Sequence, residues 1–267
     1  MDSDPADRQN FDVRIQGSLT LSCGDQSSGC AISMGSRRAR QPGRKTRERG
    51  DRTRDRILDA AERLFAKHGY DGVSLRTLAT AAEAQLGLVH YHFGDKLDLY
   101  RALWARWFPA ADLNAPSQAG LALPVGAPLE SNIRSFVDHF YGPLMSVFQN
   151  PRGRHLLTIV GREMSDPKEA SRGLVKKYLD PRAKMLVNDI HTLMPSLTKG
   201  EVTLAYNMMI GIATSIFVQH ARIIRMSHGA VNVKEMVKSL PAVTEFVVGG
   251  WVGIFESSRK RRTGKSR

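Results

Sequence analysis

Two adjoining stretches decide how this sequence folds: TRDRILDAAERLFAKHGYDGVSLRTLA at residues 53–79 and AAEAQLGLVHYHFGDKLDL at residues 81–99. The first opens with apolar residues that recur at the 3.6-residue period of a helix, so that one face comprises Ile57, Ala60, Ala61, Leu64 and Phe65. Gly69 is placed to end that helix, because glycine readily adopts the left-handed conformation found at helix ends. We therefore expect a helix from Thr53 to about Gly69.

Three more helices are expected in the rest of the two stretches. Ser74 offers a side-chain oxygen to cap a short second helix, and a break at residues 83–84 leads into a third helix over residues 85–92. Asp95 follows a Phe-Gly turn and is placed to cap a fourth helix. Two short helices joined by a tight turn and supported by a third form a helix-turn-helix, whose second short helix enters the major groove of DNA.

These residues resemble the DNA-binding domain of tetracycline-repressor (TetR) family regulators. The most telling part is GLVHYHFGDK at residues 87–96, where the family shows a small residue, an aromatic pair, a phenylalanine, a turn and a lysine. The resemblance implies a homodimeric transcriptional repressor. It also implies that the C-terminal helices bind a small molecule that weakens DNA binding.

The resemblance implies roles for individual side chains as well. It places Arg76, Gln85 and Leu86 at base-reading positions. It places four others at phosphate-contacting positions: Ser74, Tyr91, His92 and Lys96. The exposed side of the third helix also offers Leu88 and His90, and such a mixture of side chains can bond to base edges and touch a thymine methyl group.

Three positions depart from the pattern of the family. Glu83 stands at the turn position usually held by glycine, so we expect a turn that is less tight or strained. His90 stands in place of the usual tyrosine of the recognition helix, and Leu88 replaces a common threonine or serine. These departures affect which DNA sequence is read and leave the expected fold unchanged.

Beyond residue 128 every segment again has a helical period, and no alternating strand pattern competes. A loop is expected over residues 109–128, a long helix over residues 167–193, and Pro241 is placed to open the last helix. The expected fold is all-α, with an N-terminal helix-turn-helix DNA-binding domain and a C-terminal helical ligand-binding and dimerisation domain. The expected segments are a disordered basic extension (1–50), the helix-turn-helix domain (51–100), the helical domain (101–258) and a basic tail (259–267).

The apolar stripes of the C-terminal helices allow two interpretations. Such stripes form hydrophobic core by default, but a ligand pocket in a helical domain is lined by the same residue types. The resemblance favours a pocket, for which the candidates are Phe136, Phe140, Leu144, Leu157 and Met208. A pocket of this kind suits an acyl or aromatic effector. The alternative function is a structural DNA-binding protein without an effector.

Two of the expected C-terminal helices also favour self-association. The helices at about residues 200–225 and 242–257 have apolar faces wider than one core stripe needs. Paired across a two-fold axis, they would form the four-helix interface of a homodimer.

The net charge of +13 comes from two segments. Residues 37–56 hold ten basic and three acidic side chains, and residues 259–267 hold six basic and no acidic ones, so the rest of the chain is neutral overall. A near-neutral body with basic arms favours a polyanionic partner such as double-stranded DNA. The first segment leads into the first helix, from which an arm can reach an adjacent minor groove, whereas the second is expected to be a solvated tail.

Other classes of protein find little support. The sequence has no G-x-S-x-G, phosphate-loop, H-E-x-x-H or G-x-G-x-x-G motif, so we expect no enzyme and no cofactor. His90 and His92 have no third ligand nearby in sequence, so no metal site is expected. No signal peptide and no run of about eighteen apolar residues is evident, and Cys23 and Cys30 fit a reducing compartment. We expect a cytoplasmic protein that does not span a membrane.

Overall fold

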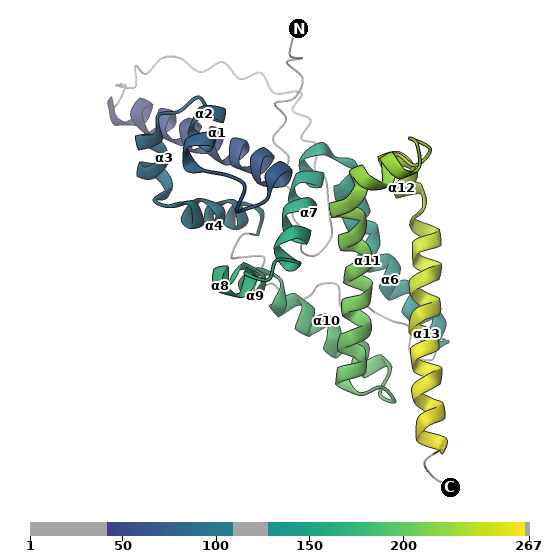
Figure 1. Cartoon of the computed structure of the whole chain (residues 1–267). Coiled ribbons are helices and arrows are strands. Elements are labelled where there is room, and N and C mark those ends of the chain that lie inside the picture. The colour runs from purple at the N-terminus through teal and green to yellow at the C-terminus, as the bar shows by residue number, and fades with distance from the viewer. Residues whose placement is uncertain (1–41, 109–127, 265–267) are drawn as a thin grey trace, which may run out of the picture. The chain divides into compact units, whose positions relative to one another are not determined.

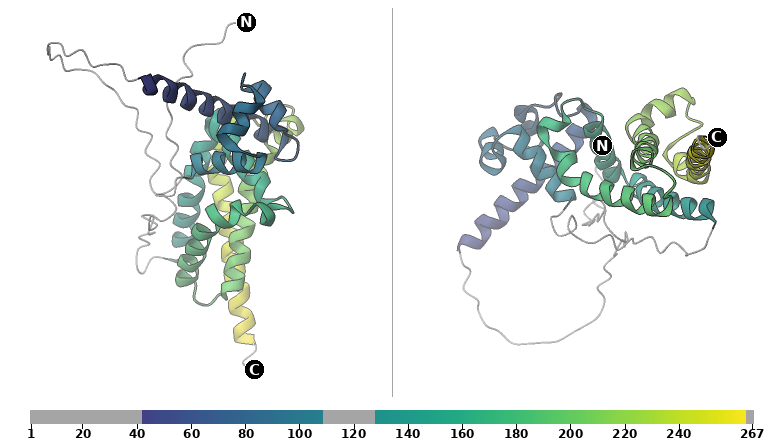
Figure 2. Two further views of the ribbon diagram at one scale, coloured as in Figure 1. Left: turned by 90° about the vertical axis from the view of Figure 1, so that its left-hand side faces the viewer. Right: turned by 90° about the horizontal axis from the view of Figure 1, so that it is seen from below.

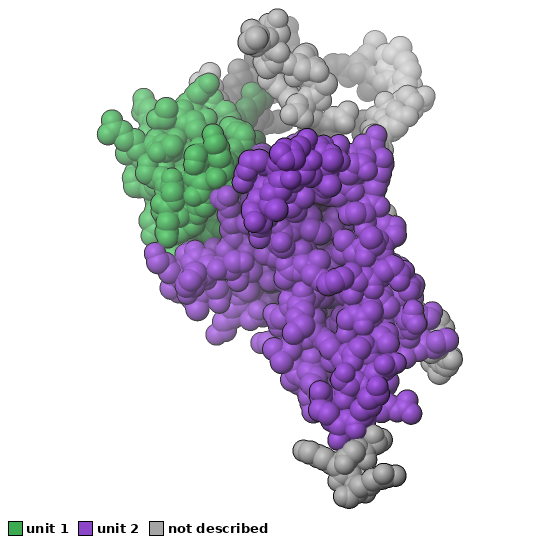
Figure 3. All heavy atoms as spheres, turned by 45° about the vertical axis from the view of Figure 1, so that its right-hand side comes forward, with its two compact units in different colours: residues 1–13, 19–103 green, residues 14–18, 104–267 purple. Residues whose placement is uncertain are grey.

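The computed structural model describes residues 42–108 and 128–264, and every regular element in these two ranges is a helix (Figure 1). The prediction of an all-α fold is therefore confirmed. The predictions for residues 1–41, for Cys23 and Cys30 and for most of the 109–128 loop lie outside the described residues. The described part of the chain divides within its fourth helix into a first unit that ends at Leu103 and a second unit that begins at Trp104 (Figure 3).

The first unit contains α1 (Pro42–His68), α2 (Leu75–Ala81), α3 (Leu86–Phe93) and most of α4 (Lys96–Trp107). Its core is made by side chains that are fully buried on each helix, including Leu58, Leu78, Val89 and Leu99. Burying four such side chains stabilises the unit by about 1.5–3 kcal/mol each. The predicted succession of helices is confirmed.

The helix ends of the first unit are fixed by the predicted residues. The Ser74 hydroxyl accepts a hydrogen bond from the backbone N–H of Thr77 at 3.0 Å, and the Asp95 carboxylate accepts one from the N–H of Asp98 at 2.8 Å. Gly69 follows α1 with a φ of +73°, as expected of a glycine that ends a helix. These local bonds set the lengths of α1, α2 and α4.

The start of α1 differs from the prediction. The helix begins at Pro42 and not near Thr53, so residues 42–50 are helical where we expected disorder. Proline is well tolerated in the first turn of a helix, and the Arg, Lys and Glu residues that follow have high helix propensity. Polar composition alone therefore misled the prediction, because this segment needs no apolar face to be helical.

The second unit contains the other described helices: α6 (Leu129–Gln149), α7 (Pro151–Met164), α8 (Glu169–Arg172), α9 (Leu174–Tyr178), α10 (Asp180–Leu193), α11 (Lys199–Met226), α12 (Val233–Lys238) and α13 (Leu240–Gly264). Within it α6 packs along α13, and α7 packs along α11 (Figures 1 and 2).

The long helix predicted over residues 167–193 is wrong, because the chain breaks at Gly173, which has a φ of +68°, and again at Leu179 before Pro181. Helix α13 extends beyond residue 259, where we expected a tail.

Buried polar groups join distant helices of the second unit. The hydroxyl of Tyr141 on α6 donates to the backbone carbonyl of Met209 on α11 at 2.6 Å, and burial raises the pKa of this tyrosine. The hydroxyl of Thr158 on α7 donates to the carbonyl of Phe217 on α11 at 3.2 Å. A Cβ added at Gly161 would lie 2.7 Å from Val218 on α11, so α7 and α11 are in close contact there. These contacts hold α11 against both α6 and α7.

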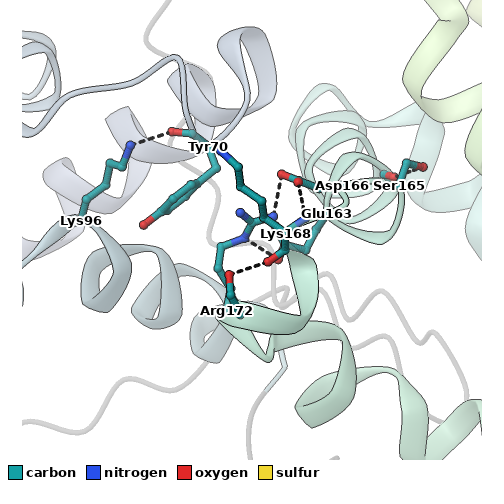
Figure 4. Close-up of polar contacts among 9 residues, drawn as sticks. Tyr70, Lys96, Glu163, Ser165, Asp166, Lys168 and Arg172 are labelled. Carbon is teal, nitrogen blue, oxygen red and sulfur yellow. Dashed lines mark hydrogen bonds and ion pairs between the residues drawn. The ribbon is translucent and has the colours of Figure 1, made fainter.

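A buried ion network joins the end of α7 to α8 (Figure 4). Arg172 lies 2.8 Å from a carboxylate oxygen of Glu163 and 2.6 Å from one of Asp166, and the Arg172 and Glu163 side chains are only 4% and 1% exposed. Burial by itself would lower the pKa of Arg172, but the hydrogen bonds that its guanidinium donates to the carboxylates of Glu163 and Asp166 raise the pKa overall. The guanidinium therefore stays charged and anchors the short helix α8.

Helix α11 is the one described helix that is long and apolar enough to cross a membrane by length and composition. Only 28% of its most apolar window is buried. The helix nevertheless packs against α7, α10, α12 and α13, and its backbone accepts the buried hydrogen bonds of Tyr141 on α6 and Thr158 on α7. Apolar side chains remain exposed elsewhere on this helix, among them Leu204 and Met208.

Candidate DNA-binding interface

The recognition helix α3 is anchored by two buried side chains and presents the rest outward. Val89 and Phe93 are buried in the core of the first unit. In contrast, the exposed fractions of Leu86, Leu88 and Tyr91 are 40%, 40% and 82%. Three large apolar side chains exposed on one eight-residue helix are typical of a surface that contacts a partner.

The start of this surface lies on α2 and at the beginning of α3. Ser74 and Arg76 are both exposed on α2 or at its cap, and Gln85 is exposed at the N-cap position of α3. The Ser74 hydroxyl is engaged in capping and also lies 2.8 Å from the hydroxyl of Thr77. The side chain of Gln85 makes no cap hydrogen bond to α3.

The turn between α2 and α3 uses the left-handed conformation without a glycine. Glu83 has a φ of +49°, in a region that side chains other than glycine adopt at some cost. Its carbonyl accepts a hydrogen bond from the Arg56 guanidinium at 3.3 Å, and the N–H of Ala84 donates to the carbonyl of Ala79 at 2.9 Å. The expected strain is therefore present, and these bonds hold the turn in place.

The far end of the surface lies between α3 and α4. The Lys96 ammonium donates to the backbone carbonyl of Tyr70 at 3.1 Å and lies 4.3 Å from the centre of the Tyr70 ring (Figure 4). The His90 ring donates through Nδ1 to the carbonyl of Gly94 at 3.0 Å, and the half-buried His92 ring lies 5.2 Å from the Tyr91 ring. The positive charge of Lys96 is thus held at a fixed position beside the end of α3.

The first unit carries all nine residues that the sequence singled out at α2, α3 and the start of α4, and seven of them are exposed, whereas His92 and Lys96 are half-buried. Sequence reasoning missed the contribution of α1. The guanidinium of Arg54 lies 5.2 Å from the centre of the Phe93 ring, and Arg56 holds the turn through Glu83. The sequence did offer a signal for these two arginines. They come just before Ile57, the first residue of the apolar face, and therefore lie on the same helix.

The residues singled out for a ligand pocket do not form one group. Phe136 and Leu157 are buried, Phe140 and Leu144 are half-buried, and Met208 is 61% exposed. Met208 is therefore not enclosed by this chain. Its neighbour Met209 is buried instead. The prediction chose the wrong methionine because both sides of α11 are apolar, so the helical period does not show which side is buried.

Two helices of the second unit expose apolar and small residues at helical spacing. On α11 these are Leu204, which is 63% exposed, Met208 and Gly211. On α13 they are Phe246, which is 73% exposed, and three exposed glycines at which an added Cβ would meet nothing within 4 Å: Gly249, Gly250 and Gly253. Such flat, apolar helix faces allow close approach of another helix.

The helix order and the exposed surface of α2 and α3 define a helix-turn-helix protein with a separate all-helical second unit. Residues 57–103 match the model of bacterial regulatory proteins of the tetR family, and residues 138–250 match that of the tetracyclin repressor-like C-terminal domain. The HTH-type transcriptional regulator AcrR of Shigella flexneri is 43% identical over 165 residues, which cover 56% of this chain and 74% of that protein. The chain belongs to the TetR family, as its resemblance predicted.

Other relatives match over shorter stretches or at lower identity. The HTH-type transcriptional repressor AcnR of Corynebacterium glutamicum is 40% identical over 74 residues, so the match spans 28% of this chain and 39% of that protein. Among solved structures, NalD of Pseudomonas aeruginosa, a repressor of a multidrug efflux pump, has a TM-score of 0.49 at 21% identity and covers 76% of this chain and 97% of its own. FadR of Bacillus subtilis in complex with stearoyl-CoA has a TM-score of 0.47 at 16% identity and covers 73% and 97%.

Proposed function

We propose that this protein is a cytoplasmic, sequence-specific transcriptional repressor without enzymatic activity, which binds an operator in double-stranded DNA as a homodimer and is released by a small apolar molecule. The observation that carries the proposal is the exposed surface of α2 and α3. It combines amide, guanidinium, imidazole and apolar groups on a helix-turn-helix whose ends and turn are held by hydrogen bonds. Membership of the TetR family supports the same reading.

In this proposal the surface divides into reading and positioning residues. Arg76 and Gln85 have the donor geometry that suits guanine and adenine edges, and Leu86 suits a thymine methyl group. Leu88 and His90 lie on the same helix and contribute to the choice of sequence. Phosphates are contacted by the remaining residues of the surface, which fix the orientation of the duplex: Ser74, Tyr91, His92 and Lys96.

The homodimer is assigned to the exposed faces of α11 and α13. Leu204, Met208 and Phe246 are more than 60% exposed, and the glycines beside them leave room for a partner helix. Two copies of this helix pair, related by a two-fold axis, bury these faces in a four-helix interface. The same burial accounts for the apolar side of α11 without a membrane.

The effector is assigned to the apolar interior of the second unit. Phe136 and Leu157 are buried there, and Phe140 and Leu144 lie beside them on α6, half-buried. An acyl chain or an aromatic compound matches such a lining. Helix α4 offers a route for release, because its first turn carries Lys96 while its Trp104 ring lies 5.8 Å from that of Tyr178 in the second unit.

The experiment that tests the proposal is a DNA-binding titration by fluorescence anisotropy. A duplex selected from a random library should bind at least about a thousandfold more tightly than a scrambled duplex of the same length. A panel of fatty acids and aromatic acids should contain a compound that lowers this affinity, and linkage requires DNA to weaken the binding of that compound by the same factor. Equal affinity for both duplexes would contradict the proposed function. If no compound releases the selected duplex, the alternative function is favoured, namely that of a structural DNA-binding protein that has no effector.

A further inference from the structure

Helix α1 begins well before the part of the chain that matches the family model. It begins at Pro42, whereas the match to the tetR-family model begins at residue 57. Residues 42–56 thus form a helical extension ahead of the helix-turn-helix, and they hold seven basic and three acidic side chains. The extension therefore carries a net charge of +4 on a helix that the proposed reading surface does not use.

The C-terminal part of this extension, residues 50–56, contacts the recognition helix α3 and the turn before it. A Cβ added at Gly50 would lie 3.9 Å from the Cε1 atom of His92 on α3. One turn later, Arg54 lies over the Phe93 ring, and Arg56 bonds to the carbonyl of Glu83 in the turn. The extension therefore runs beside the C-terminal end of α3, where the proposed phosphate-contacting residues Tyr91 and His92 lie.

The helical repeat determines which residues before Gly50 lie on the same face of α1. Residues 47, 50 and 54 follow the i, i+3, i+7 spacing of one helix face, so position 47 shares the face that meets α3. From Gly50 to Pro42 the helix extends about 12 Å further at 1.5 Å per residue. Each strand of duplex DNA carries one negative charge per about 3.4 Å of helix axis, so a segment of this length can face about three or four phosphates of one backbone.

We propose that residues 42–56 of α1 are a second DNA-contacting element, which lies along the phosphate backbone of the duplex that flanks the half-site read by α3. The inference rests on the proposed DNA-binding function. The extension contributes affinity and a longer footprint, and it adds no sequence preference, because its cations meet phosphates and not base edges. Where the sequence suggested an arm that reaches a minor groove, the proposal assigns residues 42–56 to a helix along the phosphate backbone.

The test uses the full chain and two sets of substitutions that remove the same charge. The extension variant carries Arg44→Gln, Lys45→Gln and Arg47→Gln, since glutamine has a helix propensity similar to that of arginine and lysine. The matched control removes three exposed cations of the second unit: Lys184→Gln, Lys199→Gln and Arg262→Gln. A third variant, Thr46→Pro, keeps every charge and interrupts the helix.

Each protein is titrated with a library-selected operator, either trimmed to its core or flanked by about one helical turn of duplex on each side. On the flanked duplex, the slope of log K against log salt concentration should fall by about two to three in the extension variant, because each lost phosphate contact accounts for about 0.9. The control should keep the slope of the unsubstituted protein. Trimming the flanks should weaken binding of the unsubstituted protein and the control, and should change the affinity of the extension variant little.

Hydroxyl-radical footprinting of the flanked duplex gives the second readout. The unsubstituted protein and the control should protect both flanks, whereas the extension variant and Thr46→Pro should protect only the core. An extension variant that keeps the full salt slope and the flank protection would overturn the inference, and flank protection by Thr46→Pro would overturn its helical form. Both results leave operator binding intact, so they differ from failure of the proposed function, in which no duplex is selected at all.

Discussion

The two units of the chain differ in the side-chain hydrogen bonds that position their helices. In the first unit the starts of the short helices are fixed by exposed, local bonds, such as those that Ser74 accepts from Thr77 and Asp95 accepts from Asp98. In the second unit buried hydroxyls also join helices that are far apart in sequence, as those of Tyr141 and Thr158 do. The short helices of the first unit thus depend on local caps, whereas the long helices of the second unit are held in place by internal bonds as well.

The largest expected effect comes from breaking the buried ion network. Arg172→Ala removes the guanidinium that pairs with the buried Glu163 carboxylate and should destabilise the second unit by about 3–5 kcal/mol in chemical denaturation. The matched control lies in the first unit, where Arg101 pairs with Asp98 at 3.1 Å but the two side chains are 49% and 53% exposed. Arg101→Ala should cost less than about 1 kcal/mol. Equal losses would remove the distinction between the units.

The next effect concerns the exposed apolar faces of the second unit. Met208→Glu places a charge in the proposed four-helix interface, where burial of an unpaired carboxylate is strongly unfavourable. Sedimentation velocity should show about twice the chain mass of 29.6 kDa for the unsubstituted protein and the mass of one chain for the variant. Met226→Glu is the control, because Met226 is also exposed on α11 but lies at its last residue. A variant that stays dimeric would place the interface elsewhere.

Smaller effects should separate the two kinds of residue on the DNA-binding surface. Gln85→Ala should lose about 1–3 kcal/mol on the selected operator and change which base pair is preferred at one position of each half-site. Lys96→Ala should weaken binding to selected and scrambled duplexes alike and lower the salt slope by about one. Competition titrations with single-base variants of the operator measure both. A changed preference in Lys96→Ala, with an unchanged salt slope, would contradict the assignment.

The smallest effect is a pH dependence at the joint between α11 and α13. The Glu201 carboxylate accepts hydrogen bonds from the N–H of Thr198 at 2.9 Å, the hydroxyl of Ser258 at 3.3 Å and the guanidinium of Arg261 at 2.7 Å. The hydrogen bonds from Thr198 are the main cause that lowers the pKa of Glu201 from 4.5 to about 2.

This lowered pKa sets the direction of the effect on stability. The unfolded chain, with an ordinary pKa, takes up the proton more readily, so the stabilisation is present above pH 4.5 and is lost as the pH falls toward about 2. Glu201→Gln should therefore flatten the decline of the unfolding midpoint in this window. Glu256→Gln, on the exposed side of α13, should keep the original profile. Parallel profiles for all three proteins would show that Glu201 does not contribute.

The contrast between the units also explains which features could be predicted from the sequence. The caps at Ser74 and Asp95, the helix end at Gly69 and the strained turn at Glu83 were all predictable, because each depends on residues a few positions away. The division of residues 169–193 into three helices was missed, although Gly173 and Pro181 are local signals for the end and the start of a helix. The pairing of Arg172 with Glu163 was not predictable, since it depends on how α8 packs against α7. Helix periodicity likewise did not distinguish the two apolar sides of α11.

The helical start of α1 was missed for a different reason. Its residues satisfy helix propensity without an apolar stripe, whereas the prediction relied on hydrophobic periodicity to recognise helices. The basic tail was judged by composition in the same way, yet Arg261 is on α13 and pairs with Glu201. Charged segments of this chain therefore carry more structure than their composition suggested.

The central claim is that a two-fold dimer reads DNA through α3, and selection of binding sites from a random duplex library by the full chain tests it most directly. The expected result is one enriched inverted repeat, whose half-sites lie about one helical turn apart, roughly 34–36 Å from centre to centre. The Gln85→Ala protein should enrich a repeat altered at the same position in both halves. Absence of any enriched sequence, or enrichment of a single half-site without its inverted copy, would contradict the account.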